Sequence, residues 1–376
     1  MQLGDIATYV NGYAFKPAEY SSYGKPIIRI QNLTGNAYQT NKFNGELSEK
    51  YAIHSGDVLI SWSASLGVFE WKGEDAWLNQ HIFKVVFDKV SVDKRYFIHH
   101  SRHAIAKGAG SAHGSTMKHL TKKTFEALPF YYPKLNDQKK IATKLDLIQD
   151  QIEEARKALA HFNSLVKSRF VEMFGRPMIN EYGWDEHKLS DVFEIIDGDR
   201  GKNYPKSEDF SSEGYCLFLN AGNVTKEGFS FFSNQFISRE RDELLRKGKL
   251  KRYDLVVTTR GTVGNIAYYD DGVPFENMRI NSGMVILRPL VDINPTYFIS
   301  YFRNPRVCSS LISGTAQPQM PIRNMRKAII MMPPMSLQNQ FSDFVQQVDK
   351  SKSIAQKQIE KLQMLYDSLA QKYFGD

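Results

Sequence analysis

The chain has 376 residues, more than one hydrophobic core usually organises, so we expect two or more domains. Its 49 lysines and arginines outnumber 41 aspartates and glutamates, and the net charge of +8 suits a polyanionic partner. The only cysteines, Cys216 and Cys308, exclude a disulfide framework and a cysteine-based zinc site. No signal-like segment and no run approaching 18 apolar residues is present, so we expect a cytoplasmic protein with no membrane contact.

The first part of the chain, residues 1–134, contains short runs of β-branched and aromatic residues separated by glycine, among them KPIIRIQNL, GDVLISW and HIFKVVF. Such runs predict strands of a mixed sheet, with a helix near residues 96–106. Similar runs return in residues 187–334 as YCLFLNAG, YDLVVTT and NSGMVILRP. We therefore expect two globular domains that each combine helices with strands.

A different pattern follows each of these parts. In residues 135–175 and again in 335–376, mostly apolar residues recur at alternating steps of four and three. A spacing of about 3.5 residues predicts a coiled-coil seam, with a long isolated amphipathic helix as the alternative. The predicted seam residues are Ile141, Leu145, Ile148, Ile152, Leu159, Phe162, Val345, Val348, Ile359, Leu362 and Leu369.

Laid on itself with a shift of 200 positions, the chain shows an internal repeat. Pro133 falls on Pro333, Gln138 falls on Gln338, and a Phe-Gly pair ends both predicted helices. Glycine after the last apolar position is a common helix stop. The predicted order is a first domain at 1–134, a spacer helix at 135–175, a linker at 176–186, a second domain at 187–334 and a C-terminal helix at 335–376.

The short linker constrains how two such helices can pair. A helix of about 37 residues spans roughly 55 Å, and the second domain has to begin near its far end. The second helix must run back along the first to pair with it, so the pair is expected to be antiparallel with approximate twofold symmetry. Two similar but non-identical domains on such a spacer would suit a DNA target with two different half-sites separated by a fixed gap.

Short motifs recur in the same order in both copies. They are an LGDI-type segment, a GDVLIS-type strand, a GST-type loop and a proline followed by glutamine, and this ordered set resembles the specificity (S) subunit of Type I restriction-modification enzymes. The resemblance covers essentially the whole chain. The motifs contain Leu3, Gly56, Gly114 and Pro133 in the first copy, and Leu189, Tyr253, Gly314 and Pro333 in the second.

The resemblance implies two target recognition domains, at residues 1–134 and 187–334, and no catalytic activity in this chain. It implies a subunit that binds a bipartite, asymmetric site in double-stranded DNA. It also implies recruitment of two adenine methyltransferase (M) subunits and, through them, of the ATP-dependent restriction and translocase (R) subunits. S-adenosylmethionine, ATP and magnesium are then expected on the partner subunits, and no cofactor or metal in this chain.

DNA recognition needs cations for phosphates and planar hydrogen-bonding groups for base edges. Residues of both kinds gather around glycine-bearing loops and at strand ends, although a solvated surface or structural ion pairs would account for some of them. The predicted DNA-binding residues are Lys16, Trp62, Ser63, Asn79, Gln80, His81, Lys107, Lys118, Lys122, Arg200, Lys202, Arg260, Arg279, Asn281, Gln317, Gln319 and Arg323.

Two other kinds of site receive little support from the sequence. His99, His100 and His103 include a helical i, i+4 pair, but no third ligand follows and the second copy lacks these histidines, so no metal site is predicted. A phosphate-binding Gly-Lys-Ser/Thr loop and a nucleophile with a paired base are also missing from the sequence. Two alternatives to a DNA-reading subunit stay open: a stand-alone nuclease or methyltransferase with an unrecognised site, and a coiled-coil adaptor that binds no DNA.

Overall fold

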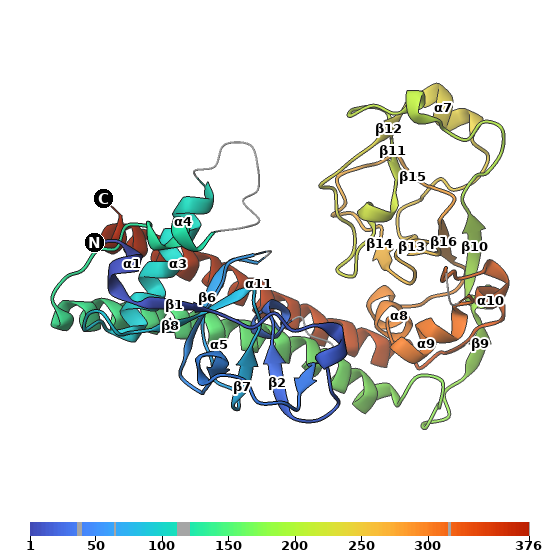
Figure 1. Ribbon diagram of the computed structural model, residues 1–376. Helices are drawn as coiled ribbons and strands as arrows, with labels where there is room; N and C mark the ends of the chain where they lie inside the picture. Colours follow the sequence, from blue (N-terminus) through green and yellow to red (C-terminus); the bar gives the residue numbers. More distant parts are fainter. Residues whose placement is uncertain (36–39, 64, 111–120, 315–316, 376) are drawn as a thin grey trace. The chain divides into compact units, whose positions relative to one another are not determined.

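The structure is a computed structural model that describes residues 1–35, 40–63, 65–110, 121–314 and 317–375. The chain forms two compact units, of which unit 1 is assembled from two separate segments and unit 2 from one continuous segment (Figure 1). Unit 1 comprises Met1–Lys157 and Ala355–Asp376, and unit 2 comprises Ala158–Ile354. The chain passes between the units inside two long helices, α5 (Leu135–Phe174) and α11 (Met335–Phe374). The predicted α+β class and both long helices are confirmed, and each helix begins at the predicted residue.

Unit 1 contains two four-stranded sheets, ordered β1-β8-β5-β6 and β3-β2-β7-β4. All neighbours pair antiparallel except β2 and β7, which are parallel. The strands are β1 (Thr8–Asn11), β2 (Lys25–Ile28), β3 (Lys42–Phe43), β4 (Ala52–Ile53), β5 (Val58–Ser61), β6 (Gly67–Glu70), β7 (Ala76–Leu78) and β8 (Ile82–Val86). Besides its parts of the two long helices, the helices of unit 1 are α1 (Leu3–Ile6), η1 (Pro17–Glu19), α2 (Ile30–Leu33), η2 (Glu49–Tyr51), α3 (Lys94–Gly110) and α4 (Lys122–Glu126).

Unit 2 contains a four-stranded sheet ordered β10-β16-β13-β14, a three-stranded sheet ordered β12-β11-β15 and the pair β17-β9. The strands are β9 (Glu186–Lys188), β10 (Phe193–Asp197), β11 (Cys216–Leu219), β12 (Phe236–Ile237), β13 (Leu255–Thr258), β14 (Ile266–Tyr268), β15 (Met278–Ile280), β16 (Met284–Pro289) and β17 (Ile329–Met331). The short helices are α6 (Leu189–Val192), η3 (Ser207–Asp209), η4 (Ala221–Asn223), α7 (Arg239–Leu244), α8 (Pro295–Phe302), α9 (Pro305–Leu311) and α10 (Ile322–Lys327).

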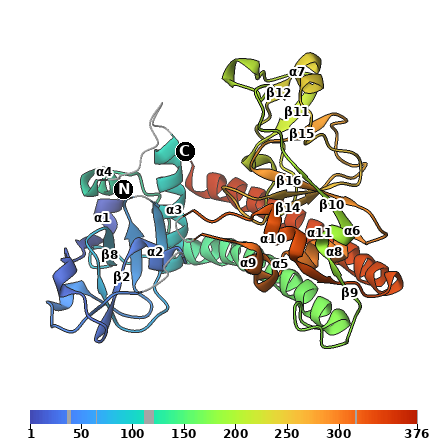
Figure 2. The same cartoon turned by 90° about the vertical axis from the view of Figure 1, so that its right-hand side faces the viewer.

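Within unit 2, the four-stranded sheet lies between two different layers. Both views place β11, β12, β15 and α7 on one side of it and the helices α8, α9 and α10 on the other (Figures 1 and 2). One face of the sheet packs on a core that includes α8 and the end of α5, and the other on a core that includes β11 and β15. The sheet is therefore buried on both faces, which leaves its ends for contacts with other molecules.

The sequence repeat is a repeat of structure. β1, β8, β5 and β6 of unit 1 occupy the positions that β10, β16, β13 and β14 occupy in unit 2, and the parallel pair β2-β7 matches β11-β15. The turns after β1 and after β10 are equally tight. A Cβ atom on Gly12 would lie 2.1 Å from the Asn79 carbonyl oxygen, and one on Gly198 would lie 2.2 Å from that of Asn281. Only glycine fits at these two equivalent positions.

A buried glutamine joins the start of each long helix to the globular part of its unit. The Gln138 side chain accepts a hydrogen bond from the Asp93 N–H at 2.9 Å and donates one to the Pro133 carbonyl at 2.9 Å. Gln338 makes the same pair of bonds, with the Asn294 N–H at 2.9 Å and the Pro333 carbonyl at 2.8 Å. The repeated proline-then-glutamine motif thus satisfies buried backbone groups at each helix entry.

Each unit holds a half of both long helices. In unit 2, the Arg169 guanidinium lies 5.7 Å from the Phe344 ring centroid, and Phe174 lies 5.5 Å from Phe341. Residue numbers rise along α5 as they fall along α11, so these halves pair antiparallel, as predicted. All the predicted seam residues are buried or half-buried, which a coiled-coil seam requires. Across the described part of the chain, no helix has both the length and the apolar character needed to span a membrane.

Candidate nucleic-acid interface

Several loops of unit 2 meet at the end of the four-stranded sheet where β10 and β13 finish and β16 begins. The N–H groups of Thr259 and Arg260 both donate to the Gly283 carbonyl, at 2.8 and 3.2 Å, and the Met320 N–H donates to the Thr259 carbonyl at 3.0 Å. Backbone hydrogen bonds therefore tie together segments that lie far apart in the sequence. We call residues 198–202, 259–264, 281–283, 313–314 and 317–320 the loop edge of unit 2.

The first segment of this edge is fixed by a buried carboxylate. Asp199 accepts hydrogen bonds from the Gly201 N–H and the Arg246 N–H, each at 2.8 Å, and these backbone donors, that of Gly201 first, hold the pKa of Asp199 below its usual range. Beside it, Arg200 pairs with Asp197 at 3.0 Å and donates to the Ser282 carbonyl at 3.2 Å. The segment is thus preorganised and presents two exposed cations, Arg200 and Lys202.

Most predicted residues of unit 2 are solvent-exposed on or beside this edge. Among the described residues, the guanidinium of Arg260 has no ion-pair partner, so it is available to an anion or a base edge. Asn281 is half-buried and its side-chain oxygen accepts from the Gly283 N–H at 2.9 Å, which gives it a role in shaping the loop. The exposed predicted residues are Arg200, Lys202, Arg260, Gln317, Gln319 and Arg323.

The equivalent edge of unit 1 comprises residues 12–16, 62–63, 65–66 and 79–81, and its chemistry is different. The half-buried Trp62 ring stacks on Phe83 with centroids 5.9 Å apart and lies 5.4 Å from the His81 ring. The Gln80 and His81 side chains lie 3.2 Å apart, from Nε2 to Nε2, at the exposed end of this stack. This edge therefore offers an amide and an imidazole where unit 2 offers mainly arginines and glutamines.

The remaining predicted residues of unit 1 fall into different classes. Ser63 and Asn79 are buried, so they support the edge rather than face solvent. Lys16 and Lys107 are exposed, while Lys122 is exposed and lies 3.7 Å from Glu126. Lys118 and Gly114 lie outside the residues that the structure describes.

The turns after β5 and β13 have the same backbone hydrogen bonding but carry different side chains at an equivalent position. The Ser61 hydroxyl donates to the Ser65 carbonyl, and the Thr258 hydroxyl donates to the Thr262 carbonyl in the same relation. This match makes Ser63 the equivalent of Arg260. The buried serine of unit 1 is thus replaced by an exposed arginine in unit 2.

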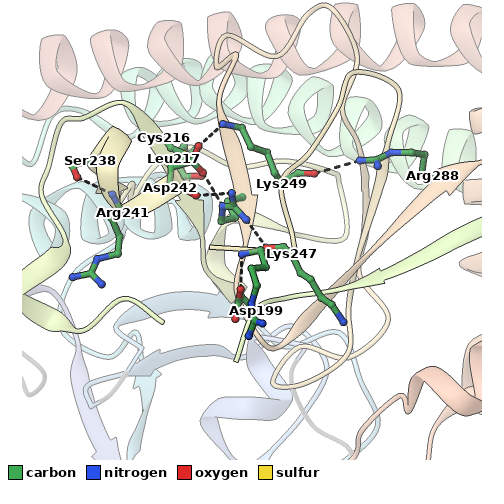
Figure 3. A network of polar contacts seen from close by, with 11 residues as sticks. Asp199, Cys216, Leu217, Ser238, Arg241, Asp242, Lys247, Lys249 and Arg288 are labelled. Carbon is green, nitrogen blue, oxygen red and sulfur yellow. Dashed lines mark hydrogen bonds and ion pairs between the residues drawn. The ribbon is translucent and has the colours of Figure 1, made fainter. Parts of the chain in front are cut away.

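Arg279 does not belong to the candidate interface, contrary to the sequence-based prediction. Its side chain is 4% exposed, and its guanidinium donates to the Asp242 carboxylate at 2.8 Å and to the Asp242 carbonyl at 2.9 Å. Lys249 binds the same carboxylate (Figure 3). Burial opposes ionisation of Asp242, but the hydrogen bonds from Lys249 and Arg279 prevail and lower its pKa. A guanidinium held in this way cannot reach a base.

The three histidines of α3 have structural surroundings. His99 lies between Asp146 of α5, at 2.8 Å, and the hydroxyl of Tyr366 of α11, at 2.7 Å, and His100 accepts from the Tyr131 N–H at 2.9 Å. Burial lowers the pKa of His100 to about 4 and also lowers the pKa values of His99 and His103. Within the described residues, no group of three or more metal-ligating side chains could hold an ion.

Sequence reasoning missed one prominent side chain near the loop edge of unit 2. Phe232 is completely solvent-exposed, at 100%. The segment GFSFFSN contains three phenylalanines, and local sequence does not indicate which of them leaves the core.

Comparison with known proteins agrees with this architecture. The family model for the Type I restriction modification DNA specificity domain matches residues 1–160 and 181–364. The EcoBI specificity subunit of Escherichia coli is 23% identical, over 99% of this chain and 83% of its own length. The MjaIX specificity subunit of Methanocaldococcus jannaschii is 24% identical, over 85% of this chain and 77% of its own.

Solved structures share the fold. A chain from a structure of complex assembly and conformational transition of the type I R-M system gives a TM-score of 0.61 at 16% identity, covering 100% of this chain and 96% of that one. The S subunit from M. genitalium gives a TM-score of 0.53 at 15% identity, with the same coverage. The repeated domains, the paired long helices and the match of the family model over both copies lead to one conclusion: the chain belongs to the family of Type I restriction-modification specificity subunits.

Proposed function

We propose that this chain recognises a bipartite, asymmetric sequence in double-stranded DNA, with one half-site for each unit. The observation that carries the proposal is the pair of loop edges. They are built on equivalent strand ends and equivalent hydrogen bonds, yet they carry different polar side chains. A shared scaffold with different side chains would place two readers on DNA in the same way and give them different sequences.

The exposed side chains of the loop edges divide into the two classes that DNA binding needs. Arg200, Lys202 and Lys16 would neutralise phosphates and give salt-dependent affinity. Arg260 could form a bidentate contact with a guanine, and Gln317 or Gln319 with an adenine. In unit 1, Gln80 and His81 would take the base-contacting role, because Ser63 is buried.

The long helices would set the distance between the half-sites. Each has 40 residues, a length of about 60 Å at 1.5 Å per residue. We further propose that two adenine methyltransferase subunits bind this chain and that the restriction subunits join through them. S-adenosylmethionine, ATP and magnesium would then act on those partners, with this chain supplying recognition and no catalytic group.

Exchange of residues 187–334 for the matching segment of a relative tests the division of labour. The complex with methyltransferase subunits is expressed in a host, and methylated adenines are mapped by single-molecule sequencing. We expect one half-site to change while the other half-site and the gap stay the same. A change in both half-sites would contradict independent readers, and turnover by the purified chain alone would favour an enzyme instead.

A single substitution tests the loop edge of unit 2. Arg260→Ala should lose discrimination of about 1 to 3 kcal/mol at one base pair of that half-site, because a bidentate contact with a guanine is removed. Lys251→Ala is the matched control, since Lys251 is an exposed cation just before the opposite end of β13. Binding to duplexes with each base pair varied would show the effect. Equal losses in the two variants would point to unspecific electrostatics.

A further inference from the structure

A loop of unit 2, residues 225–235, joins η4 to β12 and carries the exposed ring of Phe232. Phe232 is 100% exposed, whereas the next most exposed large apolar side chain in the described parts of the chain is Met364, at 72%. A phenyl ring wholly in water gains none of the stabilisation that burial gives. The exposed ring of Phe232 therefore does not contribute to the stability of the fold through burial.

An apolar surface on which Phe232 could pack is present beside the loop, since neighbouring rings of the same loop pack on it. Phe229 and Phe231 stack on each other with centroids 5.6 Å apart, and Phe231 meets Phe275 edge-on at 4.9 Å. All three of these rings pack against the core formed by β11, β13 and β15. The two neighbouring phenylalanines are thus held inward while Phe232 points into solvent.

The backbone on both sides of Phe232 is fixed by a buried side chain. Asn223 is 1% exposed, and its amide nitrogen donates to the carbonyls of Ser230 and Ser233, each at 3.0 Å. The Ser230 N–H returns a hydrogen bond to the Asn223 carbonyl at 2.9 Å. The ring is consequently presented by a preorganised loop, which lowers the entropy lost when it binds.

This loop begins beside the turn that carries Arg260. A Cβ atom on Gly261 would lie 3.9 Å from the Ala221 Cβ, and the Asn265 side chain donates to the Val224 carbonyl at 2.9 Å. The loop also carries an exposed cation, Lys226, followed by the exposed carboxylate of Glu227. Phe232 therefore belongs to a loop that adjoins the loop edge of unit 2.

We propose that Phe232 is a wedge that inserts between adjacent base pairs beside the half-site of unit 2 and unstacks that step. Apolar side chains act in this way in DNA-bending proteins. The inference rests on the proposed function and extends it. Because pyrimidine–purine steps deform most easily, the wedge would add a sequence preference at a step where no hydrogen bond reads the bases.

DNA fits this surface better than a protein partner does. Protein interfaces are formed by contiguous apolar patches, whereas Phe232 is one exposed ring that follows the half-buried Phe231 and precedes the polar residues Ser233 and Asn234. A flat ring on a loop that adjoins the turn of the exposed Arg260 matches the alternation of base stacks and phosphates in a duplex.

The test uses the full chain with its methyltransferase subunits and duplexes that carry the methylated sequence found by genome mapping. 2-Aminopurine replaces one base at a time beside the half-site, away from the methylated adenines, where base flipping by the methyltransferase would also raise fluorescence. The variants are F232A, F232W and L290A. Leu290 is a matched control because it is an exposed apolar residue just past the far end of β16 from Gly283.

Wild-type protein should raise 2-aminopurine fluorescence at one step, and F232A should abolish that rise and weaken binding about tenfold. F232W should keep the signal, L290A should match wild type, and all variants should share one melting temperature because Phe232 makes no core contact.

Tight DNA binding with no fluorescent step, or with F232A unchanged, would overturn the wedge and leave the proposed function standing. If F232A instead impaired methyltransferase assembly with DNA binding intact, the ring would be a protein contact. Absence of any specific DNA binding by wild type would remove the proposed function itself.

Discussion

Units 1 and 2 share one backbone design but place different side chains at equivalent buried positions. In the parallel strand pair, Trp77 of unit 1 faces Ile27, and its equivalent Arg279 of unit 2 faces Phe218 and is neutralised by Asp242. A ring fills in one unit the space that an ion pair fills in the other. What the two copies share is the set of hydrogen bonds that joins strand ends and helix entries, and the side chains around that set are free to differ.

The same contrast appears where α3 and α8 contact the long helices. Unit 1 buries His99 and His100 there, whereas the equivalent residues of unit 2 are Ser300 and Tyr301. Because burial lowers the pKa values of these histidines, unit 1 should lose stability once the pH falls below about 6.5, the pKa of an unfolded histidine, whereas the buried carboxylates of unit 2 should cost stability only below about pH 4. This difference can be tested separately from DNA binding.

The largest expected effect follows from the buried ion pair of unit 2. Asp242→Ala would leave Arg279 buried without its counter-charge, which should destabilise unit 2 by about 3 to 5 kcal/mol. Hydrogen exchange resolved by peptide would show lost protection in β13 and β16 and unchanged protection in β5 and β8. Asp197→Ala removes a more exposed carboxylate and should cost less than about 1 kcal/mol. Equal losses in both units would show that they do not unfold independently.

The next largest loss of stability should follow from replacing Gln138 or Gln338, and it should be the same size in both units. Gln138→Ala leaves the Asp93 N–H and the Pro133 carbonyl without partners, and Gln338→Ala does the same to their equivalents in unit 2. Each variant should lose about 2 to 3 kcal/mol, because buried unsatisfied groups bear their full desolvation penalty. Urea unfolding followed by hydrogen exchange would assign each loss to its own unit. Gln151→Ala, at an exposed position of α5, serves as the control.

A smaller effect should separate the units by pH. Because burial lowers the pKa of His100 to about 4, the folded state binds fewer protons than the unfolded state between that pH and an unfolded pKa near 6.5. The resulting stability is complete above that unfolded value and is lost as pH falls, by on the order of 2 kcal/mol from His100 at pH 5.

His99 shifts in the same direction, between Asp146, Arg95 and Arg102. Asp242 and Asp199 of unit 2 have lowered pKa values, so their contribution is present above the unfolded carboxyl pKa near 4 and is lost only below it. Hydrogen exchange measured at pH 7 and pH 5, and corrected for the intrinsic rate, should therefore show that the amides of α3 lose protection at pH 5. The amides of α8 should keep theirs. Equal weakening of both helices would contradict this assignment.

Much of the architecture was predictable because its signals are local. The alternation of steps of four and three marked both long helices, and glycine-punctuated apolar runs marked three strands in each unit, β2, β5 and β8 in unit 1 and β11, β13 and β16 in unit 2. The repeated Pro-Gln motif was also visible, although only the structure shows that Gln138 and Gln338 bridge a helix entry to a distant backbone group. The positive backbone angle of Tyr253, φ 73°, where unit 1 has Gly56, was not apparent from its sequence neighbours.

The candidate interface was predictable only in part, because residue type does not determine exposure. Arg260 and Arg279 both stood at strand ends in the sequence, yet one is exposed and the other is buried against Asp242, 37 positions away. Phe231 and Phe232 are adjacent, but Phe231 packs against Phe275 and Phe232 is exposed. The sequence by itself determined the duplication and the long helices, since repetition and periodicity are written along the chain, and its ordered motifs were enough to indicate the family. The tertiary structure alone decided which polar and aromatic groups are exposed at the loop edges, because their burial depends on residues that folding brings from elsewhere.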